Sequence, residues 1–257
     1  QAMAARRGAK VSEQTLERLA GQSAGMTIAN LERVIQEAGV MAAQTGTSIT
    51  DEMLEEAFEK ARMGAATEAP DAKTLERIAR HEAGHTLIAW LGGNLPVQVT
   101  IVGRGGAGGF MEREADEKRI IYTKPEIEQL IREAMGGRAA ELLYYGEEEG
   151  LSTGVGSDLS HASQWAMRMV QEFGMDNGLG QFAMAEIARN SAGDGPLSAR
   201  VARQAQRIVD EQLKQALALL QKNRPVLDAL IAELLKKNRL TREEMREIFD
   251  RIQNKTN

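Results

Sequence analysis

The sequence predicts a mainly α-helical protein in two parts, with a small β-hairpin or sheet in the second part. Only 4% of the 257 residues are aromatic, while alanine, leucine, glutamate and arginine, which favour helices, are plentiful. Apolar residues recur at spacings of three and four along most of the chain, which is the period of a helix. One stretch differs, because residues 97–102 (VQVTIV) alternate and are rich in β-branched side chains, as a strand requires.

The first part is predicted to contain three helices. After a basic lead-in at residues 1–10, they are expected at about 12–20, 28–43 and 51–62. Thr27 and Thr50 stand where an N-cap is expected. The predicted buried stripes are Ile28, Leu31, Ile35, Ala38 and Ala42 in the second helix and Leu54, Ala57, Phe58 and Ala61 in the third. The stretch GAATEAPDA has the composition of a linker, so we expect domains at residues 1–64 and 65–257.

The second part is predicted to begin with a long helix and a β-hairpin. The helix is expected at about 72–91, and the hairpin is formed by 97–102 and a short extended piece at 109–111. Capping boxes at Thr123/Glu126 and Thr241/Glu244 mark two later helix starts. A less regular stretch ends at about residue 195. The remaining helices are expected at about 124–144, 158–172, 198–222, 225–236 and 242–253.

Composition excludes several classes of protein. The formal net charge is −5 and no long basic block occurs, so nucleic acid is not an expected partner. Cysteine is absent, which excludes disulfides and thiolate metal sites. No apolar run approaches the roughly 20 residues that span a bilayer, and no secretory signal opens the chain. The chain begins at Gln1, so we expect a fragment or a processed form.

The segment HEAGH at 81–85 contains two of the three histidines in the chain. Residues i and i+4 lie on one face of a helix, so His81 and His85 can present two imidazole nitrogens to one metal ion. Glu82 follows His81 and can reach a water on that ion, where it would act as general base. The helix is apolar nearly all round, so we expect the motif to be buried. Gly84 in mid-helix indicates that something approaches the backbone closely.

Local pattern leaves the third metal ligand open. Three residues are comparable candidates: Asp158 at a predicted helix start, Glu141 within a helix, and His161. Glu112 is weaker, because it stands among solvated charges at a strand end. The metzincin pattern is excluded, since Ile88 and Leu91 occupy the positions that it requires to be glycine and histidine.

Several motifs in a fixed order resemble the FtsH-type ATP-dependent zinc metalloproteases, over almost the whole chain. They are HEAGHT at 81–86, VTIVGRGGAGGFM at 99–111, GGRAAE at 136–141, STGVGSDL at 152–159, FGMDNGLG at 173–180 and LTREE at 240–244. Residues 11–64, with GMTIANL at 25–31, resemble the helical lid of the AAA ATPase module.

The resemblance implies a zinc endopeptidase that acts on unfolded or extended polypeptides. It implies that Asp158 joins His81 and His85 as the zinc ligands, that Glu82 activates the water, and that Glu141 supports the site from behind. It also implies a homo-hexamer, and a position on the cytoplasmic side of a membrane if the parent protein follows the family. The sequence contains no G-x-x-x-x-G-K-[ST], so this chain alone is not expected to hydrolyse ATP.

Two other hypotheses remain open at this point. One is a structural or regulatory zinc domain whose peptidase is idle. The other is a helical interaction module without a metal. A third, a dinucleotide site at GRGGAG (103–108), is disfavoured, because the charged residues that follow do not begin an apolar helix face.

Overall fold

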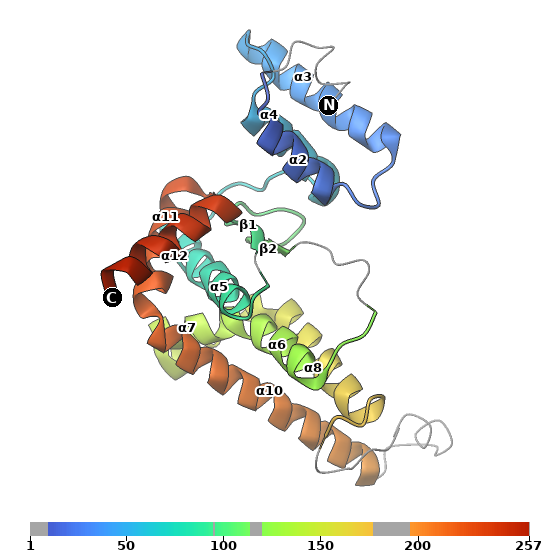
Figure 1. Ribbon diagram of the computed structural model, residues 1–257, viewed down its shortest axis with the longest axis vertical. Helices are drawn as coiled ribbons and strands as arrows, with labels where there is room; N and C mark the ends of the chain where they lie inside the picture. The colour runs from blue at the N-terminus through green and yellow to red at the C-terminus, as the bar shows by residue number, and fades with distance from the viewer. Residues whose placement is uncertain (1–9, 95, 114–119, 177–195, 257) are drawn as a thin grey trace. The chain divides into compact units, whose positions relative to one another are not determined.

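The computed structural model describes residues 10–94, 96–113, 120–176 and 196–256. They confirm the predicted fold class, because helices dominate and one small three-stranded sheet accompanies them (Figure 1). The lead-in before residue 10 and most of the less regular stretch before residue 196 lie outside the described residues. The helices are α2 (Glu13–Gln22), α3 (Ile28–Thr45), α4 (Asp51–Met63), α5 (Ala72–Leu91), α6 (Lys124–Ala134), α7 (Gly136–Glu149), α8 (Gly156–Gln171), α10 (Pro196–Lys222), α11 (Arg224–Lys237) and α12 (Arg242–Thr256), with a 3₁₀ turn η1 (Thr153–Val155) before α8.

The chain forms two compact units. Unit 1 comprises Gln1–Ala69 and the loop Val102–Gly108, and unit 2 comprises Pro70–Ile101 and Gly109–Asn257. In unit 1, α2, α3 and α4 (blue in Figure 1) enclose a core of apolar side chains. These are Leu19, Val34, Ala38, Ala42, Ile49, Leu54, Ala57 and Phe58. Ser12, Thr27 and Thr50 cap the three helices through their hydroxyls.

Two details of the predicted first part are wrong. Ile28, expected in the buried stripe, is 70% exposed, because it is the first residue of α3 and stands outside the core cluster. Helix α2, expected to end at about residue 20, continues to Gln22, with Ser23 as its C-cap.

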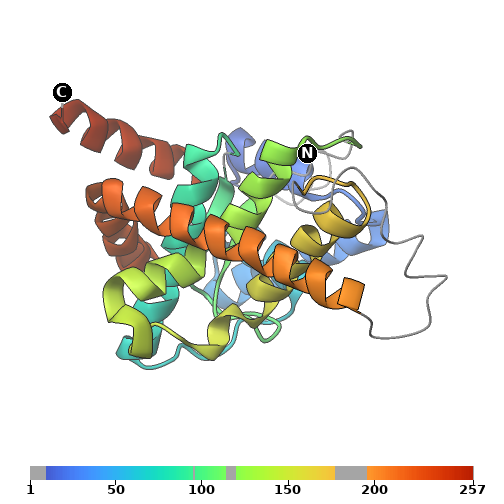
Figure 2. The same ribbon diagram turned by 90° about the horizontal axis from the view of Figure 1, so that it is seen from below.

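Unit 2 is built around α5. Helices α7, α10 and α11 and strand β1 pack against α5, and the long helix α10 lies across α6, α7 and α8 (Figure 2). The main core includes Ala83, Leu87 and Ile88 of α5. A second core joins α6, α8 and α10 through Ile131, Ala166 and Val209. Among the described residues, no helix has the length and apolarity needed to cross a membrane.

The sheet has the strand order β2-β1-β3. Strands β1 (Pro96–Thr100) and β2 (Phe110–Arg113) form the predicted antiparallel hairpin. Strand β3 (Arg239–Thr241) was not predicted, and it pairs antiparallel with the other edge of β1. Three residues are too few for a period to be visible, so only pairing with β1 makes them a strand. The sheet leaves β2 at an edge.

The helix predicted at 124–144 is wrong in one respect, since it is two helices. Helix α6 ends at Ala134 and α7 begins at Gly136, with Met135 as the cap between them. The sequence contains no proline at this point. The Gly136–Gly137 pair is the local signal for the break, because glycine weakens a helix interior.

Candidate metal centre

Helix α5 presents both imidazoles of the HEAGH segment at one point. Asp71 caps the helix by accepting from the N–H groups of Lys73 and Thr74. One turn separates His81 and His85, and their Nε2 atoms lie 3.0 Å apart. The two rings meet edge to face, with centroids 4.7 Å apart. The predicted pairing of the two histidines on one helix face is therefore present.

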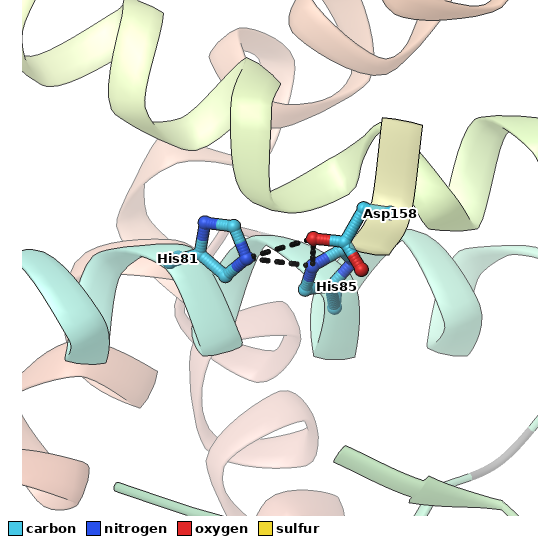
Figure 3. Close-up of side chains that lie close together, drawn as sticks. All are labelled: His81, His85 and Asp158. Atoms are coloured by element: carbon cyan, nitrogen blue, oxygen red, sulfur yellow. Dashed lines mark hydrogen bonds and ion pairs between the residues drawn. The ribbon is translucent and has the colours of Figure 1, made fainter. Parts of the chain in front are cut away.

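Asp158 closes the group from the first turn of α8. Its Oδ2 lies 3.0 Å from Nε2 of His81 and 3.2 Å from Nε2 of His85. Figure 3 shows the carboxylate approaching both imidazoles from α8. The Asp158 side chain is 23% exposed, against 12% and 9% for the two histidines, so the group is nearly enclosed but reachable from solvent.

Hydrogen bonds on the far side of each ring fix its tautomer. Nδ1 of His85 lies 2.7 Å from the backbone carbonyl of Glu133, which can only accept, so this nitrogen donates. Nδ1 of His81 lies 2.9 Å from Oε1 of Glu141, which as a carboxylate also accepts. In the neutral form of each ring, Nε2 then carries the lone pair, and this lone pair is directed at the point that the two rings share with Asp158. This is the ring orientation that metal-binding histidines require.

The spacing of the three donors fits zinc. Ligands at about 2.0–2.1 Å in a tetrahedron lie about 3.3 Å from one another. The three donor–donor distances here are 3.0, 3.0 and 3.2 Å. His81, His85 and Asp158 form the one group of three potential metal-ligating side chains found within the described part of the chain. Two imidazoles and one carboxylate leave a fourth tetrahedral position for water, as in catalytic zinc sites.

The electrostatics of the group favour a positive charge at its centre. Burial alone would lower the pKa of His81, but hydrogen bonds with Asp158 and Glu141 outweigh burial and raise that pKa to about 10. Burial alone would raise the pKa of Asp158, but its hydrogen bonds with His81 and His85 hold the pKa well below its usual range. Carboxylates that stabilise a protonated imidazole stabilise a metal cation by the same attraction.

Glu82 is buried beside this group. Burial raises the pKa of its carboxyl, and the neighbouring His85 and His81 oppose that rise. Gly109, the residue before β2, lies against it, since a Cβ built on Gly109 would be 2.9 Å from Cγ of Glu82. Edge strand β2 therefore begins next to the carboxylate that the sequence nominates as general base.

Glu141 supports His81 from helix α7 and is itself held by arginine. Its Oε2 accepts from Nη1 of Arg77 at 2.6 Å, and Arg77 also donates to the carbonyl of Glu149. Burial alone would raise the pKa of Glu141, but hydrogen bonds from His81, Ser152 and Arg77 lower it. Glu141 contacts the outer nitrogen of His81, on the opposite side of the ring from Asp158.

The structure separates the sequence candidates for the third ligand. Asp158 meets both Nε2 atoms, Glu141 meets only Nδ1 of His81, and His161 is exposed and outside the group. Glu112 accepts from Nε2 of Gln98 in the sheet. Sequence reasoning missed the carbonyl of Glu133, because a backbone atom leaves no mark in a side-chain pattern.

Two histidines on one helix, a distant carboxylate that closes the triangle and a buried glutamate beside them define the HExxH class of zinc-dependent hydrolases. The sequence pattern of peptidase family M41 matches residues 68–248, and the chain belongs to this family.

Three similar curated proteins are named as FtsH zinc metalloproteases. The chain is 34% identical to "ATP-dependent zinc metalloprotease FtsH 2" of Symbiobacterium thermophilum, over 91% of this chain and 41% of the relative. It is 34% identical to the FtsH of a Synechococcus strain, over 91% of this chain and 39% of that protein. It is 35% identical to the FtsH of Mycobacterium tuberculosis, over 91% of this chain and 32% of that protein. The chain thus spans about two fifths or less of the length of these relatives.

Proposed function

We propose that this chain is the zinc endopeptidase part of an ATP-dependent protease and hydrolyses peptide bonds of unfolded or extended polypeptides. One observation carries the proposal: Oδ2 of Asp158 and the Nε2 atoms of His81 and His85 lie within 3.2 Å of one another. The Nδ1 atoms of both histidines are hydrogen-bonded elsewhere. Membership of a peptidase family and relatives named zinc metalloproteases support it.

In the proposed mechanism, His81, His85 and Asp158 hold a zinc ion. When bound, zinc supplies a Lewis acid and lowers the pKa of a water molecule. The Glu82 carboxylate accepts a proton from the attacking water and delivers it to the nitrogen of the leaving amine as the C–N bond breaks. Burial raises the pKa of Glu82. A raised pKa suits a carboxyl group that must both take and release a proton near neutral pH.

We propose that the edge strand β2 binds the substrate peptide in an extended conformation. In the described sheet, β1 pairs with one side of β2 and no strand pairs with the other. An extended peptide can add to such an edge through main-chain hydrogen bonds, which do not depend on its sequence. Because β2 begins beside Glu82, a peptide paired with it would bring its carbonyls towards the metal group.

Cleavage of unfolded casein by the wild-type chain and by Glu82→Gln tests the proposal. We expect both proteins to bind about one zinc per chain, and the variant to cleave roughly 10²–10⁴-fold more slowly, which is the usual contribution of a general base. Equal rates, or no cleavage by either protein with zinc bound, would favour the idle zinc domain. A wild-type chain that binds no zinc would favour the helical interaction module.

Three further proposals rest on the family resemblance. Residues 1–64 correspond to the helical lid of an AAA module, the assembly is a homo-hexamer, and the parent protein places this part on the cytoplasmic side of a membrane. The phrase "ATP-dependent" in the relatives' names supports the first. Native mass spectrometry checks the second, and a purely monomeric chain at working concentration would contradict it.

A further inference from the structure

Helix α7 contacts helix α5 at a point where each of the two helices has a glycine. A Cβ built on Gly84 would lie 2.3 Å from the carbonyl oxygen of Gly136, and one built on Gly136 would lie 2.9 Å from Cα of His85. The two backbones therefore touch at this crossing, as the glycine in HEAGH predicted. The next residue, Gly137, has a different neighbour.

Gly137 lies against the imidazole of His81. A Cβ at this position would be 2.4 Å from Cε1, 2.5 Å from Nε2 and 2.6 Å from Nδ1 of that ring, and these are its three nearest atoms. Real Cβ atoms do not approach other atoms so closely, so alanine here would require the ring to move. On α7, the ring of His81 thus meets the bare backbone of Gly137 beside the carboxylate of Glu141.

The conformation of Gly137 does not require glycine. The residue is helical and buried in the first turn of α7, and its φ is not among the positive values that other glycines of this chain adopt. Glycine destabilises a helix relative to alanine. Space for the imidazole is therefore the physical reason for glycine at this position.

Gly137 and Glu141 act on the same ring from the same face of α7. Residues i and i+4 of a helix lie one above the other. Gly137 admits the ring, and Glu141 accepts from its Nδ1 at 2.9 Å, which leaves Nε2 pointing at Asp158 and His85. Translation of the ring is limited by Gly137, and its rotation is limited by the hydrogen bond with Glu141.

We infer that Gly137 is a positioning residue for the metal group: it sets the place of the His81 imidazole, and through it the affinity and geometry of zinc. The inference rests on the proposed zinc site but not on peptidase activity. It assigns to the GGRAAE segment a role at the metal, through its second glycine as well as its glutamate.

Gly137→Ala in the full chain tests this, with Gly156→Ala as the matched control. Gly156 begins α8, and a Cβ there meets nothing within 4 Å. We expect Gly137→Ala to weaken zinc binding about 10–100-fold, as losses of outer support around a metal do. We also expect it to change the visible spectrum of the cobalt-substituted protein. Gly156→Ala should leave both unchanged. Wild-type zinc affinity and cobalt spectrum in Gly137→Ala would overturn the inference.

A second measurement separates positioning from general packing. Because the clash is with the imidazole, removing the ring should remove it. In a His81→Ala background, Gly137→Ala should leave the melting temperature unchanged or raise it, whereas in the wild-type background it should lower it. Equal lowering in both backgrounds, or failure of the double variant to fold, would overturn the inference. A wild-type chain that binds zinc but cleaves nothing would contradict the proposed function and leave this test intact.

Discussion

Each histidine of the metal group is fixed at both ring nitrogens, and the partners come from far along the chain. Nδ1 of His85 is bound by a carbonyl 48 residues away, and Nδ1 of His81 by a carboxylate 60 residues away. Asp158, 73 and 77 residues from the two histidines, meets both Nε2 atoms. Such double restraint keeps the lone pairs aimed at one point, so little rearrangement is needed when a cation enters.

At this scale the choice of third ligand can be tested. We predict that Asp158→Ala loses zinc almost completely, because it removes a charged donor that touches both Nε2 atoms. Glu141→Ala should weaken zinc binding by about 10–100-fold, because Glu141 acts on the metal only through His81. His161→Ala, on an exposed side chain outside the group, serves as the control and should keep wild-type affinity. Metal analysis and chelator competition measure this order, and the reverse order would refute the assignment.

At the scale of elements, the break between α6 and α7 has two consequences for the site. The last carbonyl groups of a helix lack partners within the helix. Near the end of α6, the carbonyl of Glu133 accepts a hydrogen bond from Nδ1 of His85. The Glu133 side chain, fully buried, also binds Arg113 at the end of β2 and Asn94 after α5. Glu133 therefore connects α6 with helix α5, which carries the two histidines, and with the edge strand β2. The new helix then begins with the glycines that α5 requires.

The unpredicted strand β3 belongs to the core of unit 2. Leu240 in its centre is fully buried and packs in the main cluster. We predict that Leu240→Ala lowers the free energy of unfolding by about 2–5 kcal/mol, the range for a buried leucine. Leu235→Ala, on the preceding helix and 38% exposed, is the control, with an expected loss of about 0.5 kcal/mol. Urea unfolding followed by tryptophan fluorescence measures both, and similar losses would show that β3 is peripheral.

At the scale of the whole molecule, the chain passes between its two units more than once. It leaves unit 1 after Ala69, returns to it for Val102–Gly108, and leaves it again at Gly109. Arg104 holds this loop within unit 1. Its side chain is fully buried and donates to Glu59, Glu56 and the carbonyl of Gly64. A loop between two strands of unit 2 therefore depends on side chains of unit 1.

We predict that Arg104→Ala destabilises unit 1 by about 3 kcal/mol, because it removes the positive charge from a buried ion pair. Lys60→Ala, which breaks the exposed pair with Glu37, should cost less than about 1 kcal/mol. Both tryptophans, Trp90 and Trp165, belong to unit 2. Fluorescence therefore reports unit 2, while circular dichroism reports both units. In Arg104→Ala, part of the unfolding transition seen by circular dichroism should move to a lower urea concentration, while the transition seen by fluorescence should not move. An equal shift of both transitions would contradict the prediction.

The sequence by itself determined the features that depend on neighbouring residues. The 3.6-residue period and the capping residues located α5 at its observed bounds and most other helices within a few residues, but they predicted one helix at 124–144 where α6 and α7 stand. The same period placed His81 and His85 on one face with Glu82 beside them, because the i, i+4 relation is a property of the helix.

Only the tertiary structure decided which groups meet His81 and His85 on this face of α5. On local pattern Asp158, Glu141 and His161 were comparable candidates. Only the packing of α7 on α5, and of α8 on α6 and α10, places Asp158 at the Nε2 atoms and Glu141 at Nδ1 of His81. The break at Met135, the carbonyl of Glu133 and strand β3 also follow from long-range contacts. Local spacing fixes the direction of a side chain on its own element, but the partner that it meets depends on contacts formed when distant segments pack.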